Sequence, residues 1–175
     1  VFEGREILTG ADTPYRVFTP YAKAWRHRFD DLGTNVQSPA TERRADLELL
    51  ARAAAFPKAA ALPPLETLGF SKTPLWLEAG EAAARDRLEN FLPRIARYAE
   101  DRDRPSIAGT SGLSVHLRFG TISIRELVRR AMLNTSRGAT VWLNELIWRE
   151  FYHMILDQFP HVADTAFKHE YEHLR

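Results

Sequence analysis

The chain of 175 residues contains no cysteine. This absence excludes disulfides, thiolate metal sites and cysteine nucleophiles. The chain also lacks an apolar run near the ~20 residues that a membrane-spanning helix needs. Its opening residues, VFEGREILTG, show no basic segment followed by an apolar one, which is the pattern of a secretion signal. The sequence therefore predicts a cytoplasmic protein that does not contact membranes.

A strong charge of either sign is also lacking, because 24 Lys and Arg residues nearly balance 23 Asp and Glu residues and leave a net charge of +1. Any nucleic-acid surface must then come from local clustering of basic residues. No His-Glu-x-x-His pattern and no Gly-x-Ser-x-Gly elbow occurs. His169 and His173 have helical i, i+4 spacing, but they lie near a charged chain end. The sequence thus predicts no metal site and no serine nucleophile.

The residues that are present predict an all-α protein. With 45% hydrophobic residues the chain can form a real core in one domain, or at most two. Strand-like alternation is rare, and there is no internal repeat. We expect Thr19 and Thr140 to cap helices, Ser123 and Glu126 to form a capping box, and Pro93 to kink or split its helix. The expected helices span residues 19–30, 81–98, 114–120, 123–133 and 141–158, with a further short one within 42–55.

The helix expected over 141–158 separates its side chains onto two faces, since an α-helix turns about 100° per residue. Within an arc of about 120° lie two indoles, a carboxylate, a guanidinium and a phenol: Trp142, Glu145, Trp148, Arg149 and Tyr152. The opposite face is apolar, with Leu143, Leu146, Ile147 and Met154. Glu150 falls among the apolar positions, and the sequence offers no partner for it. The polar face must meet water, another segment of the protein or a ligand with anionic and aromatic surfaces.

A turn rich in small residues, GTSGLS, spans residues 109–114. Glycines leave the backbone amides accessible, and three hydroxyls lie beside them. Such turns hold phosphate groups without using much charge, although many are simply loops. The turn is therefore a candidate phosphate site, and its composition does not by itself exclude a plain loop.

Taken together, WLNELIWREFY at 142–152 and GTSGLS at 109–114 resemble the DNA photolyase/cryptochrome family. The resemblance extends to Tyr98, twelve residues before Thr110, to RDRP at 102–105 and to YRVFTPYAKAW at 15–25. It covers most of the chain and weakens between about 31 and 79. It implies that residues 1–79 are an interdomain linker with a first helix. Residues 80–175 would then be the N-terminal part of the family's helical FAD-binding domain.

The resemblance also implies roles for individual residues. The positions that match FAD contacts are Tyr98, Thr110, Ser111, Gly112, Leu113, Ser114, Trp142 and Arg149. Glu145 matches the carboxylate that hydrogen-bonds the damaged pyrimidine, and Trp148 matches the indole on which the flipped lesion stacks. These two are the catalytic candidates. The positions expected to contact DNA are Arg102, Glu145, Trp148, Arg149 and Tyr152.

Two departures from the family pattern fall in and after the turn. Gly112 stands where a basic residue is common, and Val115-His116 replaces a frequent Pro-Tyr pair. Both changes are expected to loosen the grip on phosphate without abolishing it.

The implied activity is light-dependent repair of cyclobutane pyrimidine dimers in DNA by electron transfer from reduced FAD. Glu145 favours this lesion, because members that repair the (6-4) lesion tend to have glutamine there. The resemblance implies a monomeric full-length enzyme, and it leaves open an antenna chromophore that this segment does not bind. Two alternatives remain open: a cryptochrome-type photoreceptor and a non-enzymatic helical DNA-binding module. The latter predicts that Trp148→Ala weakens the binding of intact and damaged DNA equally.

Family members carry an N-terminal antenna domain and a second half of the FAD domain. The resemblance places the start of this chain near the end of the linker and its end partway through the helical domain. We therefore expect a fragment that by itself binds FAD weakly or not at all and repairs nothing. Stoichiometric flavin in a spectrum of the purified, FAD-incubated chain would show this expectation to be wrong.

Overall fold

The computed structural model describes residues 1–32, 63–71 and 73–173. Over these residues the chain is helical, which confirms the predicted all-α class, and an isolated bridge between Leu8 and Pro14 is the β-type pairing they contain. The helix expected within 42–55 lies outside the described residues. The elements are α1 (Phe18–Leu32), η3 (Leu65–Leu68), α3 (Glu81–Phe91), η4 (Leu92–Arg97), α4 (Tyr98–Asp101), α5 (Ser114–Arg118), α6 (Ile124–Met132), α7 (Arg137–Gln158), η5 (Pro160–Ala163) and η6 (His169–Tyr171), where η denotes a 3-10 helix.

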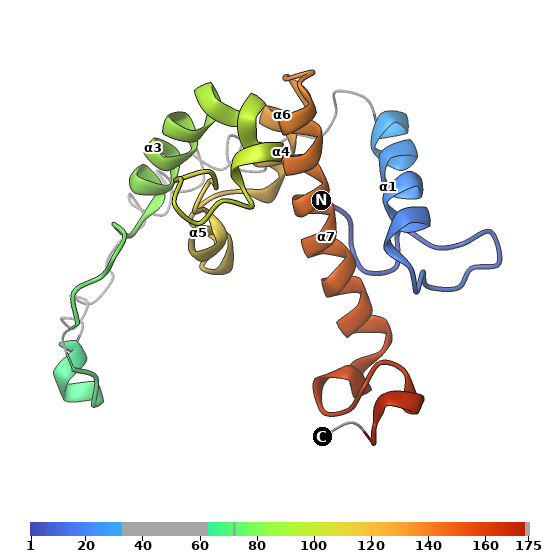
Figure 1. Ribbon diagram of the computed structural model, residues 1–175. Helices are drawn as coiled ribbons and strands as arrows, with labels where there is room; N and C mark the ends of the chain where they lie inside the picture. Colours follow the sequence, from blue (N-terminus) through green and yellow to red (C-terminus); the bar gives the residue numbers. More distant parts are fainter. Residues whose placement is uncertain (33–62, 72, 174–175) are drawn as a thin grey trace, which may run out of the picture.

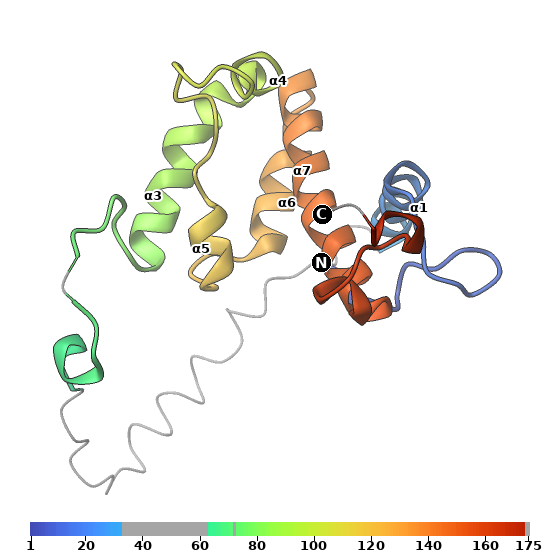
Figure 2. The same cartoon turned by 60° about the horizontal axis from the view of Figure 1, so that its bottom comes forward.

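Helix α7 is the element on which the others assemble. It contacts α1, η4, α4, α6 and η5. In Figure 1 α1 stands to one side of it, and α3, α4 and α5 stand to the other. Figure 2, turned by 60°, keeps α1 and α3 on opposite sides of α7. The apolar face predicted for this helix is confirmed, because its members are buried: Leu143, Leu146, Ile147 and Met154.

The start of α7 differs from the prediction. The helix begins at Arg137, and the Ser136 hydroxyl caps it by accepting a hydrogen bond from the Ala139 amide at 3.2 Å. Thr140, the expected cap, lies inside the helix and donates its hydroxyl to the Ser136 carbonyl at 3.2 Å. Most of the loop expected before Thr140 is therefore helix. Tertiary packing extends it, because Gly138 lies directly against the carbonyls of η4 and leaves no room there for a Cβ atom.

The other helix boundaries test three expectations. Pro93 does split its helix, since α3 ends at Phe91 and the proline begins the 3-10 segment η4. The capping box is wrong: Ser123 precedes α6 but makes no side-chain cap, and Glu126 instead pairs with Arg129 at 2.7 Å. Helix α1 begins at Phe18, one residue before the Thr19 cap expected for it.

None of the helices among the described residues combines the length and the apolar character needed to cross a membrane. The described part of the chain likewise contains no group of three or more histidine, aspartate or glutamate side chains placed to bind a metal ion. His169 instead lies 2.6 Å from the Glu172 carboxylate, three residues along the chain.

Candidate functional site

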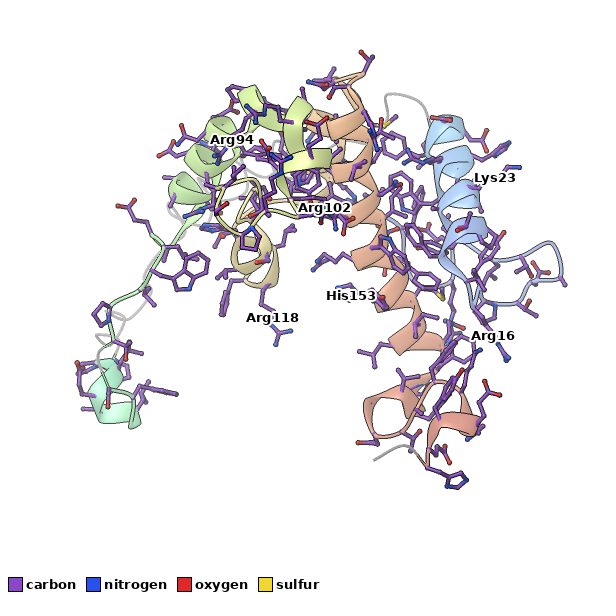
Figure 3. All side chains as sticks on the ribbon, in the orientation of Figure 1. Arg16, Lys23, Arg94, Arg102, Arg118 and His153 are labelled. Atoms are coloured by element: carbon purple, nitrogen blue, oxygen red, sulfur yellow. The ribbon has the colours of Figure 1, made fainter. Side chains whose placement is uncertain are left out.

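The end of α4 and the middle of α7 bring three of the predicted site residues together. Arg102, which follows α4 directly and is labelled in Figure 3, donates from Nη1 to the Glu145 carboxylate. The same guanidinium lies over the Tyr98 ring, 5.5 Å from its centroid, and its Nε is 3.4 Å from the Asp103 carboxylate. The hydrogen bond that Arg102 donates to Glu145 is the main cause that raises the pKa of Arg102. The guanidinium therefore stays charged.

The ion pair is reachable from solvent. The Arg102 and Glu145 side chains are 30% and 37% exposed, and only one carboxylate oxygen of Glu145 bonds to Arg102. Among the described residues, no donor bonds to its other oxygen, Oε2. Tyr98 is buried, and burial raises the pKa of its phenol, with Glu145 adding to the rise and Arg102 opposing it. The cluster thus offers a neutral phenol, a cation and a carboxylate with an open oxygen.

Trp142 lies behind this cluster and not on its surface. Its side chain is 3% exposed and lies 5.0 Å from the Phe91 ring, which in turn contacts Tyr98 edge-on at 5.8 Å. Of the three environments left open for the polar arc, Trp142 has the second, another segment of the protein, because η4 and α4 pack against α7.

Trp148 and Tyr152 form a second, aromatic group. The Trp148 ring stacks on Phe18 of α1 with centroids 3.6 Å apart and planes 7° from parallel. Tyr152, which is exposed, stacks on Trp148 at 5.3 Å and 24°. The resemblance assigned the stacking of a flipped lesion to Trp148, and this role stays a prediction, while Phe18 covers one face of the ring. A base would have to use the remaining surface or displace Phe18.

Arg149 lies in a third environment. It lines two cavities, of about 290 and 410 Å³, that both include the first three residues of the chain. The first cavity also contains His153, whose pKa is lowered by burial and by Arg149. Four side chains of the α7 arc, Trp142, Glu145, Trp148 and Arg149, therefore do not meet in one cavity among the described residues. The structure joins Glu145 to Tyr98 and Arg102, and it separates Trp142, Trp148 and Arg149.

The glycine-rich turn lies directly against α4. Gly109 contacts the Asp101 backbone so closely that a Cβ atom would overlap its carbonyl. Leu113 is buried and anchors the other end, and Gly112 has a φ of +63°, which favours glycine. Among the described residues, the amides of 110–114 donate to no backbone carbonyl. The hydroxyls of Thr110, Ser111 and Ser114 make no hydrogen bond there either. The turn is thus a set of unused donors that packs, through Gly109, against Asp101 at the end of α4.

Glu150, which had no partner in the sequence, is fully satisfied. Its carboxylate accepts hydrogen bonds from the Val1 nitrogen at 2.7 Å, the Phe2 amide at 3.1 Å and the Trp25 indole at 2.8 Å. Sequence reasoning missed these contacts, and it also missed Phe18, since the partners lie more than a hundred residues away. The only signal was the misfit of an acid among apolar positions.

Comparison with known proteins explains this arrangement. The chain is 38% identical to the deoxyribodipyrimidine photo-lyase of Synechococcus sp., over 93% of this chain and 35% of that protein. It is 36% identical to the deoxyribodipyrimidine photo-lyase of Halobacterium salinarum, over 96% of this chain and 35% of that protein. It thus spans about a third of the length of the curated relatives it matches. No family model matches the chain.

A solved structure supports the same fold. The crystal structure of a class III photolyase from Agrobacterium tumefaciens matches 99% of this chain and 36% of its own chain, with a TM-score of 0.73 at 23% identity. The fold is therefore that of a photolyase-type helical domain. With the similarity to the curated relatives, the chain is a homologue of about a third of the length of the deoxyribodipyrimidine photo-lyases.

Proposed function

We propose that this chain contributes the helical FAD-binding region of an enzyme that repairs cyclobutane pyrimidine dimers in DNA with light. Its partner is DNA that contains such dimers, and the complete enzyme acts as a monomer. The observation that carries the proposal is the partly exposed Arg102–Glu145 pair at the end of α4, the helix against which Gly109 of the turn packs. The names of the relatives, deoxyribodipyrimidine photo-lyases, supply the reaction class. Residues 80–175 form the FAD-binding part in this proposal, and residues 1–79 the linker and first helix.

The residues of the glycine-rich turn fit the diphosphate of a flavin dinucleotide. Thr110, Ser111 and Ser114 present hydroxyls, and the amides of 110–114 present N–H groups, all of which suit a diphosphate. Tyr98, at the start of α4, would contact the same ligand with its neutral phenol. In this proposal Trp142 would contact FAD from the core of the domain, and Arg149 would contact it from the side of the N-terminal segment. The chemistry that FAD supplies when bound is light-driven, one-electron reduction of the dimer.

The damaged base would meet Glu145 and Arg102. The open oxygen of Glu145 accepts a hydrogen bond from an N–H of the pyrimidine, and Arg102 orients the carboxylate through its own hydrogen bond while it faces the DNA backbone. Trp148 and Tyr152 provide aromatic surface for a flipped lesion, where stacking adds roughly 1–3 kcal/mol per base. A dimer is easier to flip than a normal base, since its pairing is already impaired.

An exchange experiment tests this function. The chain replaces the matching 35% of the Synechococcus relative, and the exchanged enzyme is given an oligonucleotide with one thymine dimer. We expect bound FAD and loss of the dimer under blue light but not in the dark. A folded exchanged enzyme that binds FAD yet neither repairs the dimer nor prefers dimer DNA over intact DNA would contradict the proposal. Light scattering of the exchanged enzyme tests the monomeric state.

A further inference from the structure

An arginine from α3 lies over the glycine of the turn. A Cβ atom on Gly112 would come within 2.5 Å of the Arg87 Nη1 atom. The guanidinium therefore occupies the space into which a side chain at position 112 would project. A glycine in this left-handed conformation, with φ of +63°, both permits the turn and leaves this space to Arg87.

Arg87 shares a cavity of about 300 Å³ with Ser111 of the turn and with Arg94 of η4. Among the residues that the structure describes, no carboxylate lies within 4.0 Å of the Arg87 or Arg94 guanidinium. Other arginines do have a carboxylate within this distance: Arg97 pairs with Asp101, Arg102 with Glu145, Arg129 with Glu126, and Arg130 with Glu89. The two arginines beside the turn thus keep their donors for another partner.

Two acids also line this cavity, Glu78 and Asp86, and they limit the kind of ligand that fits. With them the cavity carries no large net charge, so it does not attract polyanions in general. The cationic side is the one where Arg87 meets Ser111 and Gly112. A guanidinium donates two parallel hydrogen bonds to phosphate oxygens, and the hydroxyl and amides of the turn complete the donor set.

We propose that Arg87 is the basic residue of the anion site at 110–114, supplied from α3 because the turn itself carries none, with Arg94 as a second cation. The ligand class is a diphosphate. That this diphosphate belongs to a flavin dinucleotide rests on the proposed function. Arg87 also lies 5.9 Å from the Trp76 ring centroid, a contact that holds the side chain without neutralising it.

The test is calorimetric titration of the chain with three probes: inorganic pyrophosphate, FAD, and riboflavin, which has no phosphate. Arg87→Ala should weaken the binding of pyrophosphate and FAD by about tenfold, the scale of one charged hydrogen bond, and should leave riboflavin unchanged. Arg87→Lys keeps the charge and should lose less. Arg85→Ala is the matched control, because Arg85 lies on α3 but lines a different cavity, with Glu89 and Arg130.

Each outcome has a distinct meaning. Pyrophosphate that binds Arg87→Ala as tightly as the parent, or that fails to bind the folded parent at millimolar concentration, overturns the inference. A parent that binds pyrophosphate through Arg87 but binds neither FAD nor riboflavin supports the inference. Absence of FAD from the folded exchanged enzyme would then contradict the flavin part of the proposed function. A parent and an Arg87→Ala variant that bind FAD with equal affinity contradict the inference about Arg87 and support the flavin part of the proposed function. Circular dichroism of each variant establishes that it is folded.

Discussion

Helix α7 carries two glutamates whose surroundings differ. The Glu150 side chain is 10% exposed, and both of its oxygens accept hydrogen bonds, from the Val1 nitrogen, the Phe2 amide and the Trp25 indole. Glu145 is 37% exposed and bonds through one oxygen to Arg102. One region of the helix is therefore a closed junction between α7, α1 and the N-terminal segment. The other is an open ion pair at the end of α4, the helix against which Gly109 of the turn packs.

The difference shows how one helix can combine support and binding. A buried charge is tolerated only when its partners are complete, and a complete set leaves nothing for a ligand. A half-exposed pair contributes little to stability but keeps its hydrogen-bonding capacity. Each glutamate also affects the pKa of one tyrosine: Glu150 adds to the rise in the pKa of Tyr21, and Glu145 adds to the rise in the pKa of Tyr98. The comparison can be tested from both sides.

The largest effect is expected from Glu150→Ala. This change leaves the Trp25 indole and two backbone nitrogens without an acceptor in a buried place, and it should lower the free energy of unfolding by about 3 kcal/mol. Glu145→Ala should cost less than about 1 kcal/mol, because its pair is half exposed. Urea unfolding of both variants measures the difference. Equal losses would remove the distinction between a closed and an open region.

Phe18→Ala opens the aromatic contact between α1 and α7. The loss of a stacked, partly buried ring should cost about 2 kcal/mol of stability. It should also uncover one face of Trp148. Acrylamide quenching, measured in a Trp76→Phe background to remove the exposed indole, should increase. Unchanged quenching would mean that Phe18 does not shield the ring in solution.

Glu145→Gln addresses the open region in the exchanged enzyme. It keeps the size of the side chain but removes the charge, and we expect about tenfold weaker binding of dimer DNA, with little change for intact DNA. Trp25→Phe is the control from the closed region, since it removes one hydrogen bond to Glu150. That control should lower stability by about 1 kcal/mol and leave the affinity for dimer DNA unchanged. Gel-shift titrations with both DNAs measure the ratio.

The smallest effect concerns pH. Burial raises the pKa of Tyr21 and of Tyr98 above the value of about 10 for an unfolded tyrosine. The folded state therefore holds both protons more tightly. The associated stability is complete below about pH 10 and is lost as the pH rises further. Urea unfolding between about pH 8 and 11 measures this effect. The free energy of unfolding should fall less in Tyr21→Phe and in Tyr98→Phe than in the parent.

Glu150→Gln sharpens the same test. Without the negative charge, the pKa of Tyr21 should fall toward its usual value, so the alkaline loss of stability should end at lower pH and be smaller. Glu145→Gln should move the pKa of Tyr98 less, because Arg102 already opposes that charge. Absorbance of the ionised phenol at high pH measures both shifts. A larger shift in Glu145→Gln would contradict the contrast.

Helix ends show where reading the sequence reaches its limit. Pro93 ends its helix for a local reason, the missing amide, and this was predicted correctly. Ser136 and Thr140 are both good caps by residue type, and the choice of Ser136 depends on Gly138, which lets the first turn of α7 pack against η4. Ser123 has a suitable glutamate three residues on, but Glu126 pairs with Arg129 instead. Packing of α7 against η4 decided the choice of Ser136, and the partner Arg129 within α6 took Glu126 away from Ser123.

The candidate site divides in the same way. The resemblance carried by the α7 and turn motifs named Tyr98, Arg102 and Glu145, and the structure brings these three together. Helical periodicity placed the other members of the arc on one face of α7. It could not show that Phe91 buries one of them or that Phe18 covers another, since a helical projection contains no neighbouring elements. Their roles toward FAD and DNA stay predictions.

The order of residues alone determined the all-α class, the break at Pro93 and the buried stripe of α7, because each depends on residues within a few positions of one another. Only the tertiary structure decided that Glu150 is closed by Trp25 and the N-terminal segment, and that Arg87 lies over Gly112. These contacts join residues 25 to 149 positions apart. Their formation depends on how whole helices pack, which no local pattern contains.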